Sequence, residues 1–156
     1  ITPAYAAFAD ISPPEVSRSW KIGGYPLFDG LARDDFRASF AKMAGLIARL
    51  HKAGVRIVAG TDGYGLELVR ELELYQQAGL TNEEALQTAT IIPARTTGMA
   101  DRLGSIEPGK TASRVLINGD ASKDLGALRR VTTVFLDGYR LDGAELREAS
   151  GFSGAP

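Results

Sequence analysis

Cysteine is absent from the sequence, and histidine occurs once, as His51. The lack of cysteine excludes disulfides, thiolate metal sites and a thiol nucleophile. Zinc and related metals need three or four ligands, so the chain alone falls short of a complete catalytic metal centre of the histidine-rich kind. No apolar run approaches the roughly 20 residues of a membrane span, and we therefore expect no membrane partner.

Charge of either sign is not in excess. With 18 basic and 19 acidic residues the net charge is −1, and no basic patch stands out, which argues against nucleic acid as a partner. The chain has 156 residues, of which 44% are apolar and 24% charged. This is the composition of an ordinary globular protein of one domain.

Helical periodicity dominates the first two thirds of the sequence. A short helix is predicted from Ala4 to Ile11, and the rest of residues 1–33 is predicted to form a long loop. Further helices are predicted at 36–52 and 66–78, with another from Asn82 and one more turn from Pro93 to Gly98. Thr81 and Glu84 have the spacing of a capping box, which marks the start of the helix at Asn82.

Extended patterns take over after about residue 104. Strands are predicted at 113–117, 131–136 and 139–141. Asp137-Gly138 lies between the last two of these and is typical of a tight hairpin turn. Residues 144–156 are predicted to form a short helix and a tail, so the whole chain has an α/β pattern.

The segment from Val55 to Gly63 is the most informative part of the sequence. Its β-branched residues, bounded by Gly54 and Gly63, predict a buried strand of a parallel sheet. Asp62 stands at the C-terminal end of this strand, where α/β barrels hold their catalytic residues. Asp62 is therefore the first candidate for catalysis, although an Asp-Gly pair after a strand is also typical of a plain turn or a helix cap.

The glycines around Asp62 suggest a second interpretation. Gly60, Gly63 and Gly65 form a G-x-x-G-x-G pattern between a strand and a helix, which makes nucleotide binding a distant alternative. The order differs from the dinucleotide fingerprint, and Asp62 would repel a phosphate. We expect instead that Gly63 lets the backbone turn beside a substrate, and that Tyr64 either lines the substrate pocket or packs on the next helix.

Other ionisable residues are predicted to be structural. His51 stands at the end of a helix, where a histidine suits the negative end of the helix dipole, and it precedes the strand that ends at Asp62. It is not counted as a metal ligand. The glutamates of the following helices are predicted to form a solvated face and a cap; they are Glu71, Glu73, Glu83 and Glu84.

Four segments between positions 53 and 110 carry a family likeness. They are Ala53-Gly54-Val55 to Gly60-Thr61-Asp62, Arg70-Glu71-Leu72-Glu73-Leu74 to Ala78-Gly79-Leu80-Thr81, Glu84-Ala85-Leu86 to Pro93-Ala94-Arg95, and Leu103-Gly104-Ser105-Ile106-Glu107-Pro108-Gly109-Lys110. In this order and spacing the segment from Ala53 to Gly138 resembles the C-terminal part of the amidohydrolase superfamily. The likeness is to its imidazolonepropionase-like and prolidase-like members, which are metal-dependent hydrolases built on a (β/α)8 barrel.

The resemblance implies a fold and a reaction. Residues 1–103 would be the C-terminal segment of the TIM barrel, 104–143 part of a small composite β-sandwich, and 144–156 a short helix and tail. Asp62 would end the eighth barrel strand, take a proton from a metal-bound water that attacks a carbonyl carbon, and also ligate a metal. The substrate would contain a C–N bond, as in an amide, a cyclic amide or a dipeptide, with Gly63 and Tyr64 beside it.

The resemblance also implies missing parts. The histidine pairs and the bridging lysine or glutamate of the family have no counterpart here, so most ligands of a divalent metal, zinc being the first choice, would lie outside this chain. A (β/α)8 barrel takes about 250 residues. We therefore expect an N-terminal portion of the hydrolase as a partner, without which the chain is inactive. The alternative is a non-catalytic fragment that associates with a second copy of itself.

Overall fold

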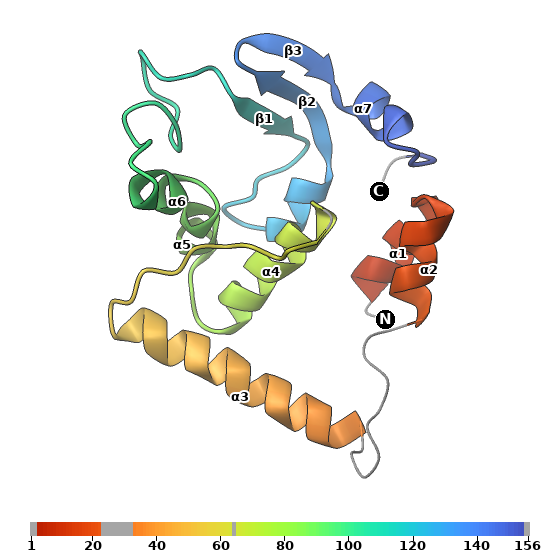
Figure 1. The fold of residues 1–156 in the computed structure, drawn as a ribbon, viewed down its shortest axis with the longest axis vertical. Coiled ribbons are helices and arrows are strands. Elements are labelled where there is room, and N and C mark those ends of the chain that lie inside the picture. The colour runs from red at the N-terminus through yellow and green to blue at the C-terminus, as the bar shows by residue number, and fades with distance from the viewer. Residues whose placement is uncertain (1–2, 23–32, 64, 155–156) are drawn as a thin grey trace.

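The computed structural model describes residues 3–22, 33–63 and 65–154 as a mixed α/β structure with a small sheet (Figure 1). The helices are α1 (Pro3–Ile11), α2 (Pro14–Ile22), α3 (Arg33–Lys52), α4 (Leu66–Gln77), α5 (Asn82–Thr88), α6 (Ile91–Thr96) and α7 (Gly143–Ala149). The strands are β1 (Arg114–Ile117), β2 (Val131–Leu136) and β3 (Tyr139–Asp142), and a 3-10 helix, η1 (Leu125–Arg129), stands between β1 and β2. Within these ranges no helix has the length and apolar character needed to cross a membrane.

The sheet confirms the predicted hairpin. Its strands lie in the order β1-β2-β3, and both neighbouring pairs are antiparallel. Leu136 pairs with Tyr139 at the end of the hairpin. The two residues of the turn, Asp137 and Gly138, have φ angles of 50° and 88°. Positive φ at both positions is the requirement of the tight turn that fits the twist of a hairpin, and the Asp-Gly dipeptide meets it.

The main buried core lies where α4, α5 and η1 meet. Its members are Leu72, Tyr75, Leu80, Ala85 and Leu125. Leu72 and Tyr75 lie on one side of α4, at the spacing of an amphipathic helix, and Ala85 comes from α5. Leu125 comes from η1, a short element that the sequence patterns did not predict. The core therefore joins the helices to the connection between the first two strands of the sheet.

The predicted capping box at the start of α5 is present. The Thr81 hydroxyl accepts a hydrogen bond from the backbone N–H of Glu84 at 3.1 Å, and the Glu84 carboxylate accepts one from the backbone N–H of Thr81 at 2.8 Å. Two N–H groups that an unfinished helix end would leave unpaired are thus satisfied. The second Glu84 oxygen lies 3.5 Å from Nε2 of His51, which ties the end of α3 to the start of α5.

Removing this cap should cost measurable stability. Thr81→Ala is expected to lower the free energy of unfolding by about 1 kcal/mol, because Glu84 loses its hydrogen-bond acceptor at the helix start. Urea unfolding followed by circular dichroism measures the change. Thr81→Ser keeps the hydroxyl and serves as the control; equal stability of the Ala and Ser variants would contradict the prediction.

The N-terminal region corrects one sequence prediction. Residues 14–22 were expected to be part of a loop, but they form α2. The prediction was wrong because Pro14 stands at the first helical position, where its missing N–H would have no intrahelical partner and its fixed φ suits a helix. Pro13 and Pro14 thus separate the end of α1 from the start of α2. Residues 23–32, the rest of the predicted loop, lie outside the described residues.

The prediction of a buried strand from Val55 onward is the second one that the structure corrects. Residues 55–60 form a stretched segment between α3 and α4 without regular secondary structure (Figure 1), and within the described part of the chain they pair with no β-strand. Val55 is 48% exposed and Val58 42% exposed, so the segment is not buried on both faces. The β-branched pattern specifies extended backbone correctly, but a strand also needs neighbours, and no local pattern can supply them.

Charged and aromatic side chains connect η1 to α4 and α1. The Arg129 guanidinium hydrogen-bonds to the Glu73 carboxylate, which also pairs with Arg70 at 3.2 Å. On its other side the guanidinium lies 5.7 Å from the ring centre of Phe8, a buried residue of α1. The prediction that Glu73 belongs to a solvated face was wrong, since its side chain is only 21% exposed.

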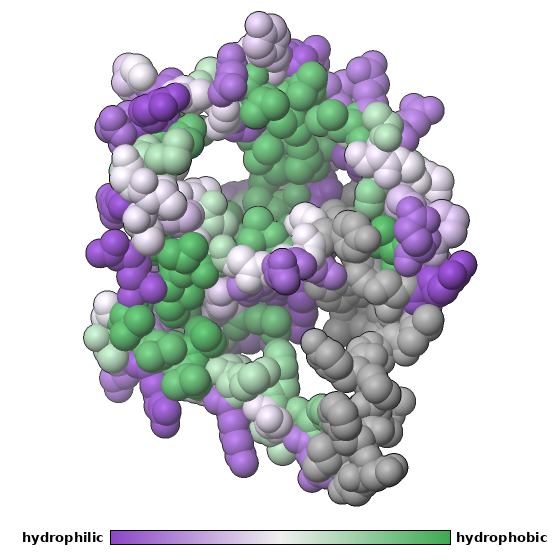
Figure 2. Space-filling view, in the orientation of Figure 1, coloured by the Kyte–Doolittle hydropathy of each residue, from purple (hydrophilic) through white to green (hydrophobic). Residues whose placement is uncertain are grey.

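Apolar side chains remain exposed on one face of α3 and in the segment after it. They are Phe36, Phe40, Met43, Leu46, Val55 and Val58. Figure 2 shows apolar surface on the face of the molecule that carries this segment, and again over the sheet at the top of the view. Contiguous apolar surface of this kind marks faces that bind another element or another chain.

Candidate functional site

Asp62 lies in an exposed bend directly after the extended segment 55–60. Its φ angle is 53°, in the left-handed region, which aspartate tolerates better than most residues with a side chain. The hydroxyl of Thr61 accepts a hydrogen bond from the backbone N–H of Gly63 at 3.3 Å, across Asp62. Asp62 is thus exposed to solvent just before the start of α4.

Two backbone hydrogen bonds hold the segment that leads to Asp62. The N–H of Ala59 donates to the carbonyl oxygen of Thr88 at 2.9 Å, and the N–H of Gly60 donates to Oε2 of Glu71 at 3.0 Å. The other oxygen of Glu71 accepts a hydrogen bond from the hydroxyl of Tyr75. The segment is thus attached to the end of α5 by main chain and to α4 by a carboxylate.

Glu71 is the residue that the sequence patterns missed. It was predicted to lie on a solvated helix face, which is wrong because both of its carboxylate oxygens accept hydrogen bonds within the protein. The helical spacing of the sequence could have predicted that Glu71 lies near the core. Leu72 and Tyr75 stand at helical spacing and mark the apolar side of the helix, and a residue four positions before Tyr75 lies on that same side.

The remaining predicted site residues have different outcomes. Gly63 is exposed in the bend and lies against the side chain of Glu67 in the first turn of α4. Tyr64 lies outside the described residues. His51 lies at the other end of the extended segment from Asp62 and pairs with Glu84, in agreement with its predicted structural role. The structure thus places Asp62 and Gly63 together and keeps His51 apart from them.

The residues around Asp62 do not form a complete metal centre by themselves. Across residues 3–22, 33–63 and 65–154 there is no group of three or more histidine, cysteine, aspartate or glutamate side chains that could hold a metal ion. Asp62 offers one carboxylate, whereas a catalytic zinc takes three protein ligands and a water. The donor set described here therefore does not fit a metal unless further ligands come from outside it.

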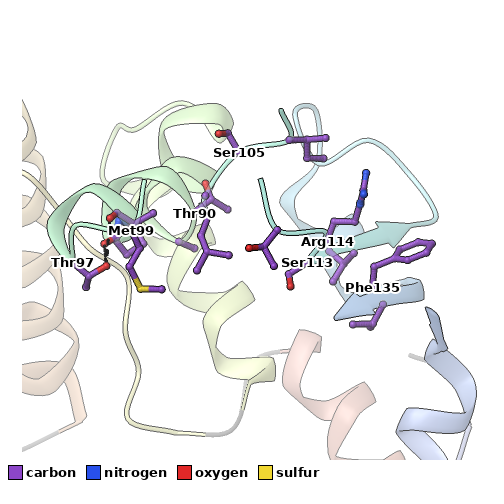
Figure 3. Close-up of a pocket in the computed structure, with 16 residues that line it drawn as sticks. Thr90, Thr97, Met99, Ser105, Ser113, Arg114 and Phe135 are labelled. Atoms are coloured by element: carbon purple, nitrogen blue, oxygen red, sulfur yellow. Dashed lines mark hydrogen bonds between the residues drawn. The ribbon is translucent and has the colours of Figure 1, made fainter. Parts of the chain in front are cut away.

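A large apolar groove lies elsewhere in the structure, between α6 and the sheet. Its volume is about 680 Å³. Figure 3 shows Thr97 and Met99 on the side of α6, and Arg114 and Phe135 on the side of the strands. Asp62 does not line it, and its walls are mostly apolar, with polar side chains such as Thr97 and Arg114 among them.

The sequence profile of the amidohydrolase family matches residues 38–141. The matched range begins in α3, includes Asp62 and ends in β3, so it covers most of the chain. The chain belongs to the amidohydrolase family. The resemblance noted in the sequence is thereby confirmed, and the structure is a mixed α/β fold with a small sheet.

Individual relatives agree with this assignment. The chain is 34% identical over 89 residues to a 5-methylthioadenosine/S-adenosylhomocysteine deaminase of Symbiobacterium thermophilum, a match that covers 47% of this chain and 20% of the relative. It is similar to a solved Xaa-Pro dipeptidase with bound methionine in the active site, with a TM-score of 0.65, 25% identity and coverage of 91% of this chain and 34% of the dipeptidase. It is also similar to an amidohydrolase from Thermotoga maritima, with a TM-score of 0.55, 34% identity and coverage of 63% and 26%.

The matches cover only a part of each relative. The chain spans about a fifth of the length of the curated deaminase and about a third of the length of the solved dipeptidase. Both relatives are named for reactions at C–N bonds, a deamination and the cleavage of a dipeptide.

Proposed function

We propose that the chain is the C-terminal part of a metal-dependent amidohydrolase that cleaves a C–N bond in an amide, a cyclic amide or a dipeptide. The observation that carries the proposal is the position of Asp62: within the matched range 38–141, at the exposed end of an extended segment that leads into a helix. The similarity to enzymes that act on C–N bonds supports the reaction class.

Asp62 is the proposed proton acceptor of this reaction. An exposed carboxylate can accept the proton of a water molecule as that water attacks a carbonyl carbon. The left-handed backbone conformation of Asp62 and the hydrogen bond from the Gly63 N–H to the Thr61 hydroxyl fix the position of the Cα atom that carries the side chain. Gly63, and Tyr64 after it, are proposed to lie beside the substrate.

The proposed enzyme needs a further portion of polypeptide. Residues 1–103 would complete a (β/α)8 barrel, with segment 55–60 as its last strand, and residues 104–143 would form part of a β-sandwich beside it. The absence of any strand partner for this segment within the described residues, and the exposure of Val55 and Val58, support this arrangement. The other portion would also supply the missing ligands of a divalent metal such as zinc.

The alternative of a self-associating, non-catalytic fragment rests on the same exposed apolar side chains, because a second copy could cover them. Nucleotide binding is a weaker alternative. The carboxylate of Glu67 lies beside Gly63, so the start of α4 has negative charge from both Glu67 and Asp62 and would repel a phosphate.

Native mass spectrometry combined with elemental analysis for zinc, manganese and iron distinguishes these proposals. The hydrolase proposal expects the 16.6 kDa chain within a larger polypeptide or complex that contains metal. A metal-free homo-oligomer would favour the self-associating fragment. A folded, metal-free monomer with no companion would overturn the hydrolase proposal.

A further inference from the structure

Glu71 links the catalytic candidate to the buried core. Its Oε2 accepts the N–H of Gly60 at 3.0 Å, two residues before Asp62, and its Oε1 accepts the hydroxyl proton of Tyr75. The Tyr75 ring is buried in the core with Leu72. A continuous set of contacts therefore runs from the core through Tyr75 and Glu71 to the backbone beside Asp62.

Within the described part of the chain, the hydrogen bond from Gly60 to Glu71 is one of two that hold the backbone just before Asp62. Within the described residues the segment 55–60 has no strand neighbour, and its other main-chain bond near Asp62 runs from Ala59 to Thr88. Gly60 is thus the last residue before Asp62 whose N–H is attached to a helix. Beyond it, the N–H of Gly63 donates a hydrogen bond to the Thr61 hydroxyl at 3.3 Å.

Tyr75 is suited to hold Glu71 in place. Burial raises the pKa of the Tyr75 hydroxyl, and the hydrogen bond and negative charge of Glu71 raise it further. The hydroxyl therefore keeps its proton at neutral pH and donates it to the carboxylate. Hydrogen bonds to an ionised acceptor are stronger than neutral ones, which favours one fixed rotamer of Glu71.

We propose that Glu71, supported by Tyr75, is the positioning residue that fixes the backbone from which Asp62 acts. The inference rests on the proposed function for its catalytic consequence and on the two hydrogen bonds of the Glu71 carboxylate for its geometry. Glu71 itself takes no proton from the substrate; it acts through Gly60 and the bend.

Amide hydrogen exchange on this chain tests the geometric part. Glu71→Ala is expected to speed exchange of the Gly60 amide on the order of tenfold, because its acceptor is lost. The Ala59 amide, which bonds to Thr88, should change less, and the core amide of Ala85 should not change and so reports an intact fold. Glu83→Ala, at an exposed glutamate of α5, is the matched control.

Two conservative variants distinguish loss of the hydrogen bond from general unfolding of the protein. Glu71→Gln keeps a carbonyl oxygen for Gly60 and should restore most of its protection. Tyr75→Phe removes the hydroxyl and keeps the buried ring, so Gly60 should exchange at a rate between those of the wild type and Glu71→Ala. Unchanged exchange of Gly60 in Glu71→Ala would overturn the inference.

Kinetics of the complete polypeptide test the consequence. Glu71→Ala should lower kcat by about 10- to 100-fold with little change in KM, because a misplaced catalytic group slows the chemical step. Glu71→Gln should recover part of kcat. If Asp62→Asn is inactive and Glu71→Ala keeps the wild-type kcat, the inference is overturned. If Asp62→Asn is active, the proposed role of Asp62 is overturned instead. In that case the exchange rate of the Gly60 amide alone tests whether Glu71 holds the backbone.

Discussion

Asp62→Asn is expected to lower kcat of the complete enzyme by about 10²- to 10⁴-fold, with a small change in KM. Asparagine has nearly the same shape but cannot accept a proton, and general base catalysis contributes rate factors of this size. Asparagine also tolerates the left-handed backbone at this position, where φ is 53°, so the bend should keep its geometry. Steady-state kinetics on a panel of dipeptides, amides and cyclic amides measures the loss.

The control for this prediction is Asp101→Asn. Asp101 is an exposed aspartate in the turn after α6, and its replacement removes the same charge at a distant place in the sequence. Thermal unfolding of both variants separates a catalytic loss from a folding defect. An Asp62→Asn enzyme with unchanged kcat would exclude Asp62 as the proton acceptor.

Arg129→Ala is expected to lower the free energy of unfolding by about 3 kcal/mol. Arg129 is 13% exposed and bonds to Glu73, which is 21% exposed, so its removal leaves a largely buried carboxylate with Arg70 as its remaining cationic partner. Breaking a buried ion pair from one side is costly for this reason. The contact of the guanidinium with the Phe8 ring, at 5.7 Å, is lost as well. Chemical unfolding measures the change.

The same pair makes stability depend on pH. Burial would raise the pKa of Glu73, but the hydrogen bonds and charges of Arg129 and Arg70 outweigh it and hold the pKa below the ordinary value of 4.5. A lowered pKa in the folded state means that the pair stabilises the fold above pH 4.5, and that this stability is lost as the pH falls through the folded value. Arg129→Ala should flatten this acid dependence.

Arg95→Ala provides the matched control for Arg129→Ala. Arg95 is an exposed arginine in the last turn of α6, and its replacement should change the free energy of unfolding by less than about 0.5 kcal/mol. Equal stability of the two variants, or the same acid dependence in Arg129→Ala as in the wild type, would show that the ion pair does not stabilise the fold.

Local signals in the sequence predict much of this structure. The capping box of Thr81 and Glu84 and the Asp137-Gly138 turn are each complete within four residues, and both are present as predicted. The strand predicted at 131–136 has those bounds in the structure. Such elements are predictable because their own side chains and backbone decide them, with little help from the rest of the chain.

The predictions are wrong where the structure of a segment depends on contacts with residues far away in the sequence. Segment 55–60 has the composition of a strand, but only a neighbouring strand could complete it. Glu71 contacts Gly60, eleven residues earlier, and no motif with that spacing announces the contact. Asp62 is a candidate from the sequence alone because its position at the end of an apolar run is itself a local pattern. The residues that hold it were missed because their contacts exist only in the folded chain.

The unpaired edge of segment 55–60 has a consequence for the order of synthesis. In the proposed enzyme this segment emerges from the ribosome after the strands that would flank it, and N-terminal parts of a protein fold first. Val55 and Val58 would then join a surface that already exists and never be exposed alone. When the 156-residue chain is produced by itself, no flanking strands are there to receive this segment. Its exposed apolar residues are then open to aggregation.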